Sequence, residues 1–336
     1  MSVAFRFCTI VCVCASLIVS ASAAPKAEMP TPARPQYVII SFDGAHDLAQ
    51  WQRSRNLAAR TGASFTYFLS CVFLLTRETR NVYRAPGKSA GRSNVGFAQS
   101  KKEVGDRLAQ IWLAHAEGHD IASHGCGHFD GKDWSRADWR SEFRSFAAIL
   151  RDAYNINEIA GEPQGWKQFS ENEIIGFRAP YLATGKALFT ALAESGFTYD
   201  ASGVSRGPNE PESGGGLIRF ALPQIAEGPK ERRVIAMDYN LFVRHSGGKE
   251  IDDTGSAFED RAYGAFLAAF DEQYRGSRIP LQIGFHFTLM NGGAYWRALE
   301  RFAGDVCTRA DVKCVSYKEY LASQRPAQAA GAGLGG

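Results

Sequence analysis

Apolar residues along this chain gather in two alternating kinds of segment. Short runs that are apolar almost without interruption are typical of strands buried on both faces of a parallel sheet. Such runs occupy residues 37–43, 63–70, 119–124, 174–181, 197–203, 233–239 and 280–287. Between them, apolar residues recur at helical spacing in segments 47–61, 101–118, 134–155, 186–196, 256–276 and 294–305. This alternation predicts an α/β fold with a mostly parallel sheet, either open or closed into a barrel.

The alternation continues through the middle of the chain without a linker or an internal repeat, so we expect one domain over residues 37–324. Residues 24–36 are rich in proline and are predicted to form a linker, whereas 325–336 have the composition of a flexible tail. Residues 75–98 form one long polar segment. A loop of that length inside a compact domain is usually functional or disordered.

The first 23 residues have the pattern of a cleaved secretory signal. Arg6 precedes an apolar run from Phe7 to Val19, and Ala21-Ser22-Ala23 fits a cleavage site. The run is too short for a comfortable membrane span, and no second span follows. We therefore expect an exported protein, periplasmic or extracellular, with no stable membrane span after cleavage.

Composition narrows the class of protein only modestly. The chain has 336 residues, of which 45% are hydrophobic and 22% are charged, so it can bury a large core. The formal net charge of +3 is small for this length. A dedicated nucleic-acid binder normally carries a strongly basic face, so we expect no nucleic-acid partner.

Cysteine usage agrees with export. Three of the seven cysteines lie in the predicted signal, which leaves Cys71, Cys126, Cys307 and Cys314. An even number in an oxidising compartment permits two disulfides. Cys307 and Cys314 are close in sequence and are expected to pair. Cys71 and Cys126 would then pair by default, and two buried free thiols remain the alternative for them.

Unusual polar residues follow the predicted strands at their carboxyl ends. They are Asp43, His124, His128, Arg178, Asp200 and His286. In parallel α/β folds, this edge of the sheet is where active sites collect. Two histidines four residues apart, together with one carboxylate, form a set that leaves coordination positions open for water. The pattern predicts a metal-dependent hydrolytic site, although a histidine pair alone is more often structural.

Five short motifs then resemble those of one known family. In chain order they are SFDG (41–44), SHGCGH (123–128), RAPY (178–181), YDAS (199–202) and IGFH (283–286). Their order resembles the polysaccharide deacetylases of the NodB-homology type, which form carbohydrate esterase family four. The resemblance covers roughly residues 37–290. It implies a distorted (β/α) barrel and amide hydrolysis of an N-acetylated sugar.

The motifs match that family unequally. RAPY matches fully, and the histidine pair has the family's spacing, although Gly125 replaces the usual hydroxyl residue. In the last motif, Ile283 stands at the usual leucine position. The first motif departs, because the family carries two adjacent aspartates and this chain has Asp43 followed by Gly44.

The single aspartate leaves the third metal ligand open. Aligning Ser-Phe-Asp with the family's Thr-Phe-Asp makes Asp43 the base and puts Gly44 at the ligand position, whereas aligning Asp-Gly makes Asp43 the ligand. We prefer the first alignment. Either His46 or Asp47 could complete the set. A helix N-cap is the structural alternative for Asp47, and a solvent-facing loop position is the alternative for His46.

The resemblance also implies a role for each remaining residue. His124 and His128 would hold Zn²⁺, with Co²⁺ or Ni²⁺ as alternatives, and Asp43 would take a proton from water. His286 would protonate the departing amine, and Asp200 would pair with it. Arg178 would orient Asp43. Pro180 and Tyr181, of the same motif, would contact the substrate. A backbone N–H near Tyr181 would bind the oxyanion.

These residues imply a partner that is an N-acetylated polysaccharide: peptidoglycan, a chitin-type polymer or an exopolysaccharide. Two other classes stay open. One is a carbohydrate-binding homologue that has lost activity with the missing aspartate. The other is an amidase acting on a small non-sugar substrate, which the secretory signal disfavours.

Overall fold

The computed structural model describes residue 1 and residues 34–324. The predicted signal, most of the predicted linker and the predicted tail therefore lie outside the described residues. The chain divides into a unit over Met1–Arg34 and a unit over Pro35–Gly336, and all helices and strands described below belong to the second unit.

Within residues 34–324, the sheet contains ten strands. They are β1 (Gln36–Asp43), β2 (Thr66–Leu69), β3 (Asp120–Ser123), β4 (Gly176–Phe177), β5 (Tyr199–Ser205), β6 (Glu212–Gly214), β7 (Leu217–Glu227), β8 (Arg232–Ile235), β9 (Leu281–His286) and β10 (Val312–Val315). Adjacent pairs from β1 through β5 to β7 are parallel, as are β9 and β10 against β1. The antiparallel strands β6 and β8 both pair with β7. The predicted mostly parallel sheet is confirmed.

The sheet curls toward closure through one bridge. Met237, which follows β8, pairs in parallel with Gly284 of β9, and the Gly284 amide donates to the Ala236 carbonyl over 2.9 Å. Because β8 lies beside β7 and β9 lies beside β1, this bridge joins the two ends of the strand order. The result is the distorted barrel that the motif resemblance implies.

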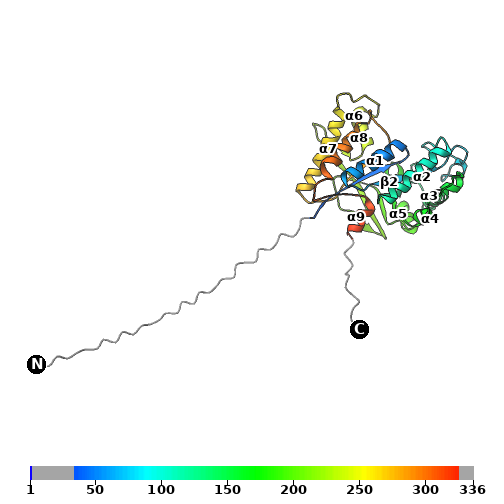
Figure 1. The fold of residues 1–336 in the computed structure, drawn as a ribbon, viewed down its shortest axis with the longest axis horizontal. Helices are drawn as coiled ribbons and strands as arrows, with labels where there is room; N and C mark the ends of the chain where they lie inside the picture. The colour runs from blue at the N-terminus through cyan, green and yellow to red at the C-terminus, as the bar shows by residue number, and fades with distance from the viewer. Residues whose placement is uncertain (2–33, 325–336) are drawn as a thin grey trace. The chain divides into compact units, whose positions relative to one another are not determined.

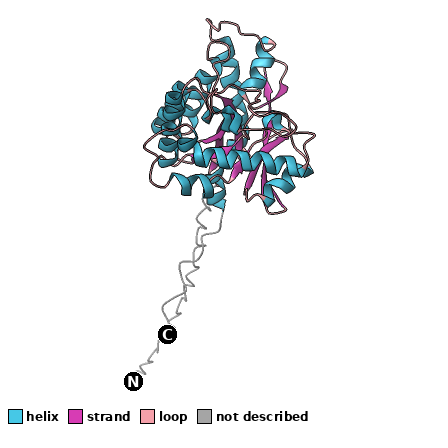
Figure 2. Cartoon of the chain, turned by 90° about the vertical axis from the view of Figure 1, so that its right-hand side faces the viewer, coloured by secondary structure: helices cyan, strands magenta, loops and turns pink. Residues whose placement is uncertain are grey.

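Nine α-helices are described within residues 34–324. They are α1 (Leu48–Thr61), α2 (Lys101–Ala116), α3 (Arg136–Ile156), α4 (Trp166–Asn172), α5 (Lys186–Glu194), α6 (Asp238–Ser246), α7 (Ala257–Arg275), α8 (Ala294–Val306) and α9 (Tyr317–Gln324). Figure 1 shows α6, α7 and α8 grouped at the left of the view and α2 to α5 at the right, and residues of both groups belong to one large core. Figure 2 shows the strands in the middle of the domain with helices around them.

Side-chain capping explains where several helices begin. The Asp47 carboxylate accepts from the Gln50 amide at the start of α1, and Ser100 caps α2 in the same way. Ser135 and Asp138 form a reciprocal capping box at the start of α3. These bonds satisfy backbone N–H groups that have no partner within the helix.

Alternate residues along the strands face two different cores. Val38, Ile40 and Phe42 of β1 belong to the large core beneath the outer helices, whereas Ile39 belongs to a smaller one. We call this smaller core the α9 cluster. Its buried members are Ile39, Phe68, Ala122, Tyr199, Ala201, Phe220, Val315, Tyr317, Tyr320 and Leu321. The C-terminal helix therefore packs on the face of the sheet opposite the large core.

Candidate active site

A cavity of about 540 Å³ lies at the carboxyl ends of the central strands. Five residues predicted from the sequence line it, and they come from segments far apart in the chain. They are Asp43, His124, His128, Tyr181 and His286. Gly44 and His46 also line the cavity, together with apolar side chains and Tyr239. Parallel strand order brings these residues together because each follows a strand that ends at the same edge.

Asp43, the last residue of β1, is buried and forms an ion pair with the fully buried Arg178. Arg178 Nη1 donates to Asp43 Oδ1 over 2.8 Å and to Ser41 Oγ over 2.8 Å. Burial alone would raise the pKa of the Asp43 carboxyl, but Arg178, His124 and His286 together lower it below its usual range. Asp43 is therefore ionised at neutral pH.

His124 directly follows β3 and is buried beside Asp43. Its Nδ1 donates to the carbonyl oxygen of Arg178 over 2.7 Å, so the proton resides on Nδ1 and Nε2 is free to accept or to bind a metal. Burial lowers the pKa of His124 to about 3, so the imidazole is neutral at neutral pH. A neutral imidazole whose other nitrogen is already bonded is the usual form of a metal-binding histidine.

His128 lies at the end of the short loop that follows His124. The two imidazole rings are 5.1 Å apart between centroids, and burial lowers the pKa of His128. The backbone of His128 is left-handed, with φ of 53°, which is uncommon outside glycine and needs support from its surroundings.

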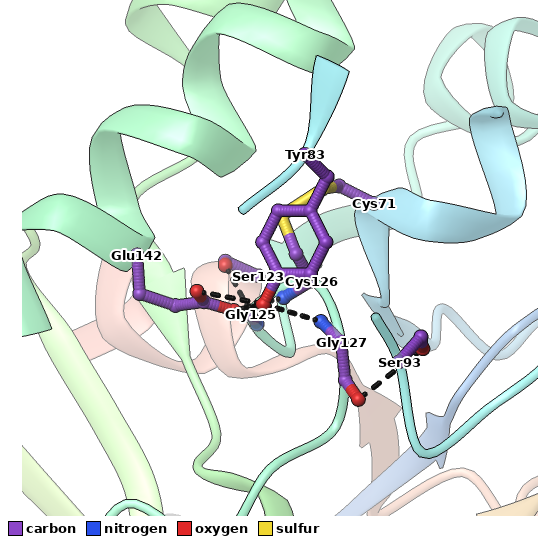
Figure 3. Close-up of a disulfide and its surroundings, with 8 residues drawn as sticks. All are labelled: Cys71, Tyr83, Ser93, Ser123, Gly125, Cys126, Gly127 and Glu142. Carbon is purple, nitrogen blue, oxygen red and sulfur yellow. Dashed lines mark hydrogen bonds between the residues drawn. A yellow bond between two sulfur atoms is a disulfide. The ribbon is translucent and has the colours of Figure 1, made fainter. Parts of the chain in front are cut away.

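Three kinds of contact provide that support, and Figure 3 shows the first two, the disulfide and the bonds of Glu142. The Cys71–Cys126 disulfide joins this loop to the segment after β2, as the default pairing predicts. Buried Glu142 accepts from the Cys126 amide over 2.7 Å and from the Tyr83 hydroxyl over 2.9 Å. The long loop 75–98 contributes from the other side, because Asn94 donates to the backbone carbonyl of His128 over 3.1 Å. The histidine loop is therefore held by covalent and polar contacts.

His286 ends β9 and is paired with Asp238. Its Nδ1 donates to Asp238 Oδ1 over 2.7 Å, and its backbone amide donates to Oδ2 over 2.7 Å. Burial opposes protonation of the ring, but the Asp238 carboxylate raises the pKa of His286 above its usual value. The side chain is 29% exposed, whereas that of Asp238 is fully buried.

The expected pairing of Asp200 with His286 is wrong. Asp200 Oδ1 accepts from the Ser202 hydroxyl over 2.6 Å, and Ser202 Oγ in turn accepts from the Ala179 amide over 2.8 Å. Asp200 thus supports the segment that carries Arg178 from behind. Burial raises the pKa of Asp200 to about 6.

The RAPY segment turns sharply where it meets the cavity. Tyr181 and Leu182 both have left-handed backbones, with φ of 58° and 54°. Two adjacent residues in this region store conformational energy of about 1–3 kcal/mol each. Tyr181 is 60% exposed, and the centroid of its ring lies 4.9 Å from that of His128. Pro180 is buried and is the first residue of the short 3₁₀ helix Pro180–Leu182 that forms this turn.

The first motif has no carboxylate at its fourth position. Gly44 has φ of 59°, and a Cβ built there would meet only Phe73, at 4.0 Å. Asp47 is occupied as the N-cap of α1. His46 lines the cavity, its Nδ1 donates to the Gly44 carbonyl over 2.8 Å, and its ring stacks on Phe73.

The donor set therefore fits a divalent metal ion in part. Two neutral imidazoles line the cavity, as zinc sites require. Asp43 Oδ1 is already bonded by Arg178. Among residues 34–324, no group of three or more His, Cys, Asp or Glu side chains is placed to hold a metal ion. The histidine pair suits a metal, and the third protein ligand of a catalytic zinc site is not assembled.

Sequence comparison gives one distant relative. No protein-family model matches the chain. Chitin deacetylase 1 of Bombyx mori is 26% identical over 193 residues, which cover 51% of this chain. The match covers 33% of that relative, so the chain spans about a third of its length.

Solved structures decide the fold. A protein from Mycobacterium smegmatis named as a polysaccharide deacetylase superposes with a TM-score of 0.54 at 16% identity, over 89% of this chain and 94% of that one. A second, from Pseudomonas aeruginosa PAO1, gives 0.51 at 16% identity, over 86% and 91%. The chain has the fold of the NodB-homology polysaccharide deacetylases. Puue allantoinase shares the same fold, with a TM-score of 0.52 at 15% identity over 86% and 90%, so the substrate must be argued from the site.

The deacetylase fold places one residue in the site that the sequence motifs underrate. Asp238 is the first residue of α6 and lies 48 residues before His286. The only sequence signal is that Asp238 lies near the end of the predicted strand 233–239. The sequence does not show that Asp238 and His286 are neighbours. The bridge between Met237 and Gly284 makes them so, because it places Asp238 beside the end of β9.

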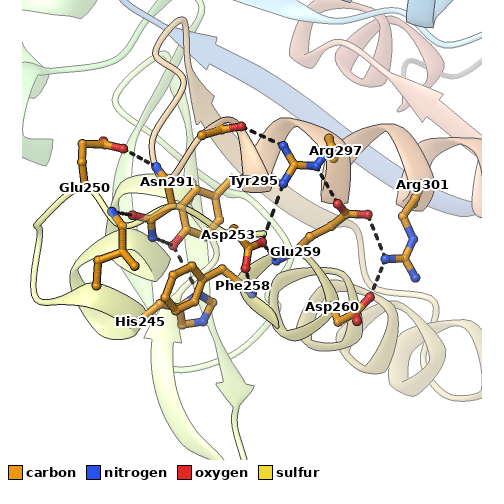
Figure 4. A network of polar contacts seen from close by, with 12 residues as sticks. His245, Glu250, Asp253, Phe258, Glu259, Asp260, Asn291, Tyr295, Arg297 and Arg301 are labelled. Carbon is orange, nitrogen blue, oxygen red and sulfur yellow. Dashed lines mark hydrogen bonds and ion pairs between the residues drawn. The ribbon is translucent and has the colours of Figure 1, made fainter. Parts of the chain in front are cut away.

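The far end of α6 is held by a polar network (Figure 4). His245, in the last turn, bonds the Glu227 carboxylate through Nε2 over 3.1 Å and the Tyr295 hydroxyl through Nδ1 over 3.2 Å. Asn291 donates to the same hydroxyl over 3.0 Å. In the deacetylase fold of this chain, both ends of the helix that carries Asp238 are therefore fixed.

Proposed function

We propose that this chain is a metal-dependent deacetylase that hydrolyses N-acetyl groups of an N-acetylglucosamine-containing polysaccharide, such as peptidoglycan, a chitin-type polymer or an exopolysaccharide. The observation that carries the proposal is one cavity lined by an ionised carboxylate and by a histidine with raised pKa. Amide hydrolysis needs that pair, a base for water and an acid for the amine. The name of the Bombyx mori relative supports the substrate class.

Asp43 is the base in this proposal. It is held ionised by Arg178, and its bond to Nη1 fixes the orientation of the carboxylate. A water molecule in the cavity would lose its proton to Asp43 as its oxygen attacks the acetyl carbonyl carbon. The Arg178 bond keeps the carboxylate a modest base, so a further group is needed to make that water acidic.

A divalent ion supplies that acidity when bound, since it lowers the pKa of its water and polarises the carbonyl. His124 and His128 would hold the ion, whether Zn²⁺, Co²⁺ or Ni²⁺, with Asp43 or His46 beside them. The Nδ1 bond of His124 to the Arg178 carbonyl would keep its Nε2 directed to this task.

His286 is the acid. Its Nδ1 donates to Asp238, so the protonated ring carries its second proton on Nε2, and this is the proton that the departing amine requires. The C–N bond breaks as that proton moves to nitrogen, leaving acetate and a free amino sugar. The negative charge of Asp238 raises the pKa of His286, which favours the protonated ring.

Exposed aromatic rings beside the cavity suit a sugar substrate. Tyr181 and Tyr239 line the cavity and are 60% and 52% exposed. Tyrosine offers an apolar ring face and a polar hydroxyl at low entropic cost. A backbone N–H near Tyr181 would bind the oxyanion, worth about 3 kcal/mol if it behaves as other such donors do.

An exported location accompanies the proposal. Two disulfides, Cys71–Cys126 and Cys307–Cys314, are typical of an oxidising compartment. Within the described part of the chain, every helix is too short or too polar to cross a membrane. We propose a periplasmic or extracellular protein.

The experiment is acetate release from N-acetylglucosamine oligomers by the purified mature chain, with Zn²⁺ or Co²⁺ added and with a chelator. His124→Ala and His128→Ala run in parallel, and Asp47→Asn serves as a control outside the site. We expect release that the chelator and both histidine substitutions abolish. Sugar binding without release would instead identify an inactive carbohydrate-binding homologue, and release only from small ureides would identify a non-sugar amidase.

A further inference from the structure

We infer that Tyr317 is a positioning residue for Asp43, acting through Arg178, so that the C-terminal helix α9 completes the active site. This role rests on the proposed function of Asp43 as the base. Tyr317 is the first residue of α9, about 270 residues after Asp43 in the chain, and its side chain is fully buried.

The Tyr317 hydroxyl has a partner on each side. It accepts from Arg178 Nη2 over 2.9 Å and donates to Gln282 Oε1 over 3.1 Å. Because the donated proton is committed to Gln282, a lone pair of the oxygen is left to face Arg178.

The remaining bonds of Arg178 make this contact decisive for Asp43. Nε donates to the Ala201 carbonyl over 3.0 Å, and Nη1 donates to Ser41 and Asp43. The guanidinium is planar, so fixing Nε and Nη2 also fixes the direction of Nη1. Among the described residues, the Tyr317 hydroxyl is the acceptor found for Nη2.

Packing sets the position of the hydroxyl independently of the cavity. The Tyr317 ring lies 4.7 Å from Phe220 and 5.4 Å from Tyr199 in the α9 cluster. Its backbone amide donates to Thr66 Oγ1 over 3.0 Å. The cluster therefore holds the ring at the start of α9, and the ring carries the acceptor for Arg178.

Substituting Tyr317→Phe keeps the ring and removes only this acceptor. Nη2 would then be a buried donor without a partner, and the guanidinium would turn to find another one. Such a turn moves Nη1 away from Asp43. Since Tyr317 is not among the residues that line the cavity, substrate binding should be unaffected.

Tyr199→Phe is the matched control. Tyr199 belongs to the same buried cluster, and its hydroxyl donates to Asp120 Oδ2 over 2.6 Å, at the opposite end of β3 from His124. Both variants lose one buried hydroxyl. Only Tyr317→Phe loses the bond to Arg178.

The test is steady-state acetate release by wild type and both variants on an N-acetylglucosamine oligomer. We expect Tyr317→Phe to lower kcat about 10- to 100-fold, as a small misplacement of a reacting group does, with KM within about twofold. Tyr199→Phe should keep kcat within about twofold of wild type. Equal kcat for the two variants would overturn the inference.

A second measurement decides the question even if wild type releases no acetate, which would count against the proposed function alone. In ¹⁵N-labelled protein, the Arg178 guanidinium should give separate, slowly exchanging Nη–H signals in wild type and in Tyr199→Phe. Those signals should broaden or merge in Tyr317→Phe, because rotation about the Nε–Cζ bond becomes faster once the bond to Nη2 is lost. Separate signals that persist in Tyr317→Phe would overturn the inference.

Discussion

Two ionisable residues at the cavity have their pKa values moved in opposite directions by named neighbours. Arg178 and two histidines lower the pKa of Asp43, whereas Asp238 raises that of His286. Groups whose surroundings separate their pKa values in this way are candidates for a base and an acid at one pH. The predictions at this scale concern single side chains and their partners.

Asp238→Asn removes the charge that raises the pKa of His286. The pKa of His286 should fall, so the alkaline limb of the kcat/KM profile should move to lower pH. The value of kcat should drop by about 10²-fold or more. A pH–rate profile of wild type and variant measures both effects. An unmoved alkaline limb would show that His286 is not the acid.

Asp200 should make stability depend on pH without contributing to chemistry. Its folded pKa of about 6 lies above the ordinary value of 3.8, so the folded state binds more protons between these values. Stability therefore falls as pH rises from about 4 to about 6, by about 3 kcal/mol in all. Urea unfolding at several pH values should show this slope in wild type and a shallower one in Asp200→Asn. Identical slopes would contradict the assignment.

Gly44→Asp should supply the missing third ligand. The left-handed backbone at Gly44 costs a side chain about 1 kcal/mol, but aspartate tolerates it better than most residues, and there is space for its Cβ. We expect Zn²⁺ affinity to rise by about tenfold or more relative to Gly44→Ala, which also adds a Cβ to the left-handed backbone but brings no carboxylate. Calorimetric titration gives both dissociation constants, and equal values would show that this position is not part of the metal set.

At the scale of elements, the site depends on a loop and a helix that other elements hold in place. Regular strands and capped helices could be predicted from spacing, because their periodicity depends on nearby residues. Helices α4, α6 and α9 and strands β6, β7 and β10 were not predicted. Helix α4 has only seven residues, and β7 mixes exposed and buried positions along a proline-containing run. The capping role of Asp47 was the alternative considered from the sequence, and the structure confirms it.

The two disulfides should differ in their effects on stability and on Zn²⁺ affinity. Replacing Cys71 and Cys126 by alanine opens a covalent loop with a sequence separation of 55 residues. The free energy of unfolding should fall by about 4 kcal/mol, and the loop that carries His128 should loosen. Replacing Cys307 and Cys314 opens a loop with a sequence separation of 7 residues and should lower the free energy of unfolding by about 2 kcal/mol. This segment holds none of the cavity residues. Only the first pair of substitutions should weaken Zn²⁺ binding. Chemical denaturation and metal titration of both double variants would reveal an equal loss of affinity if this were wrong.

For the whole molecule, closure of the curled sheet explains why one partner was misassigned. Strand ends could be read from the sequence, and four of the six residues placed at them line one cavity. The partner of His286 could not be read in this way, because β8 and β9 are separated by two helices in the chain and meet only through the Met237–Gly284 bridge. Asp200 was also expected at the carboxyl end of a strand, but it is the second residue of β5, and its side chain bonds Ser202 behind the site. Similarly, Arg178 meets Tyr317 only because α9 packs across the sheet.

The most direct measurement of the central claim is acetate release from N-acetylglucosamine oligomers by wild type and by Asp43→Asn, each with saturating Zn²⁺. Asparagine keeps the size of the side chain and an acceptor for Arg178, but it cannot take a proton. The account predicts chelator-sensitive release by wild type and a loss of about 10²-fold or more in Asp43→Asn. Equal release by the two proteins would contradict it, because Asp43 would then not be the base.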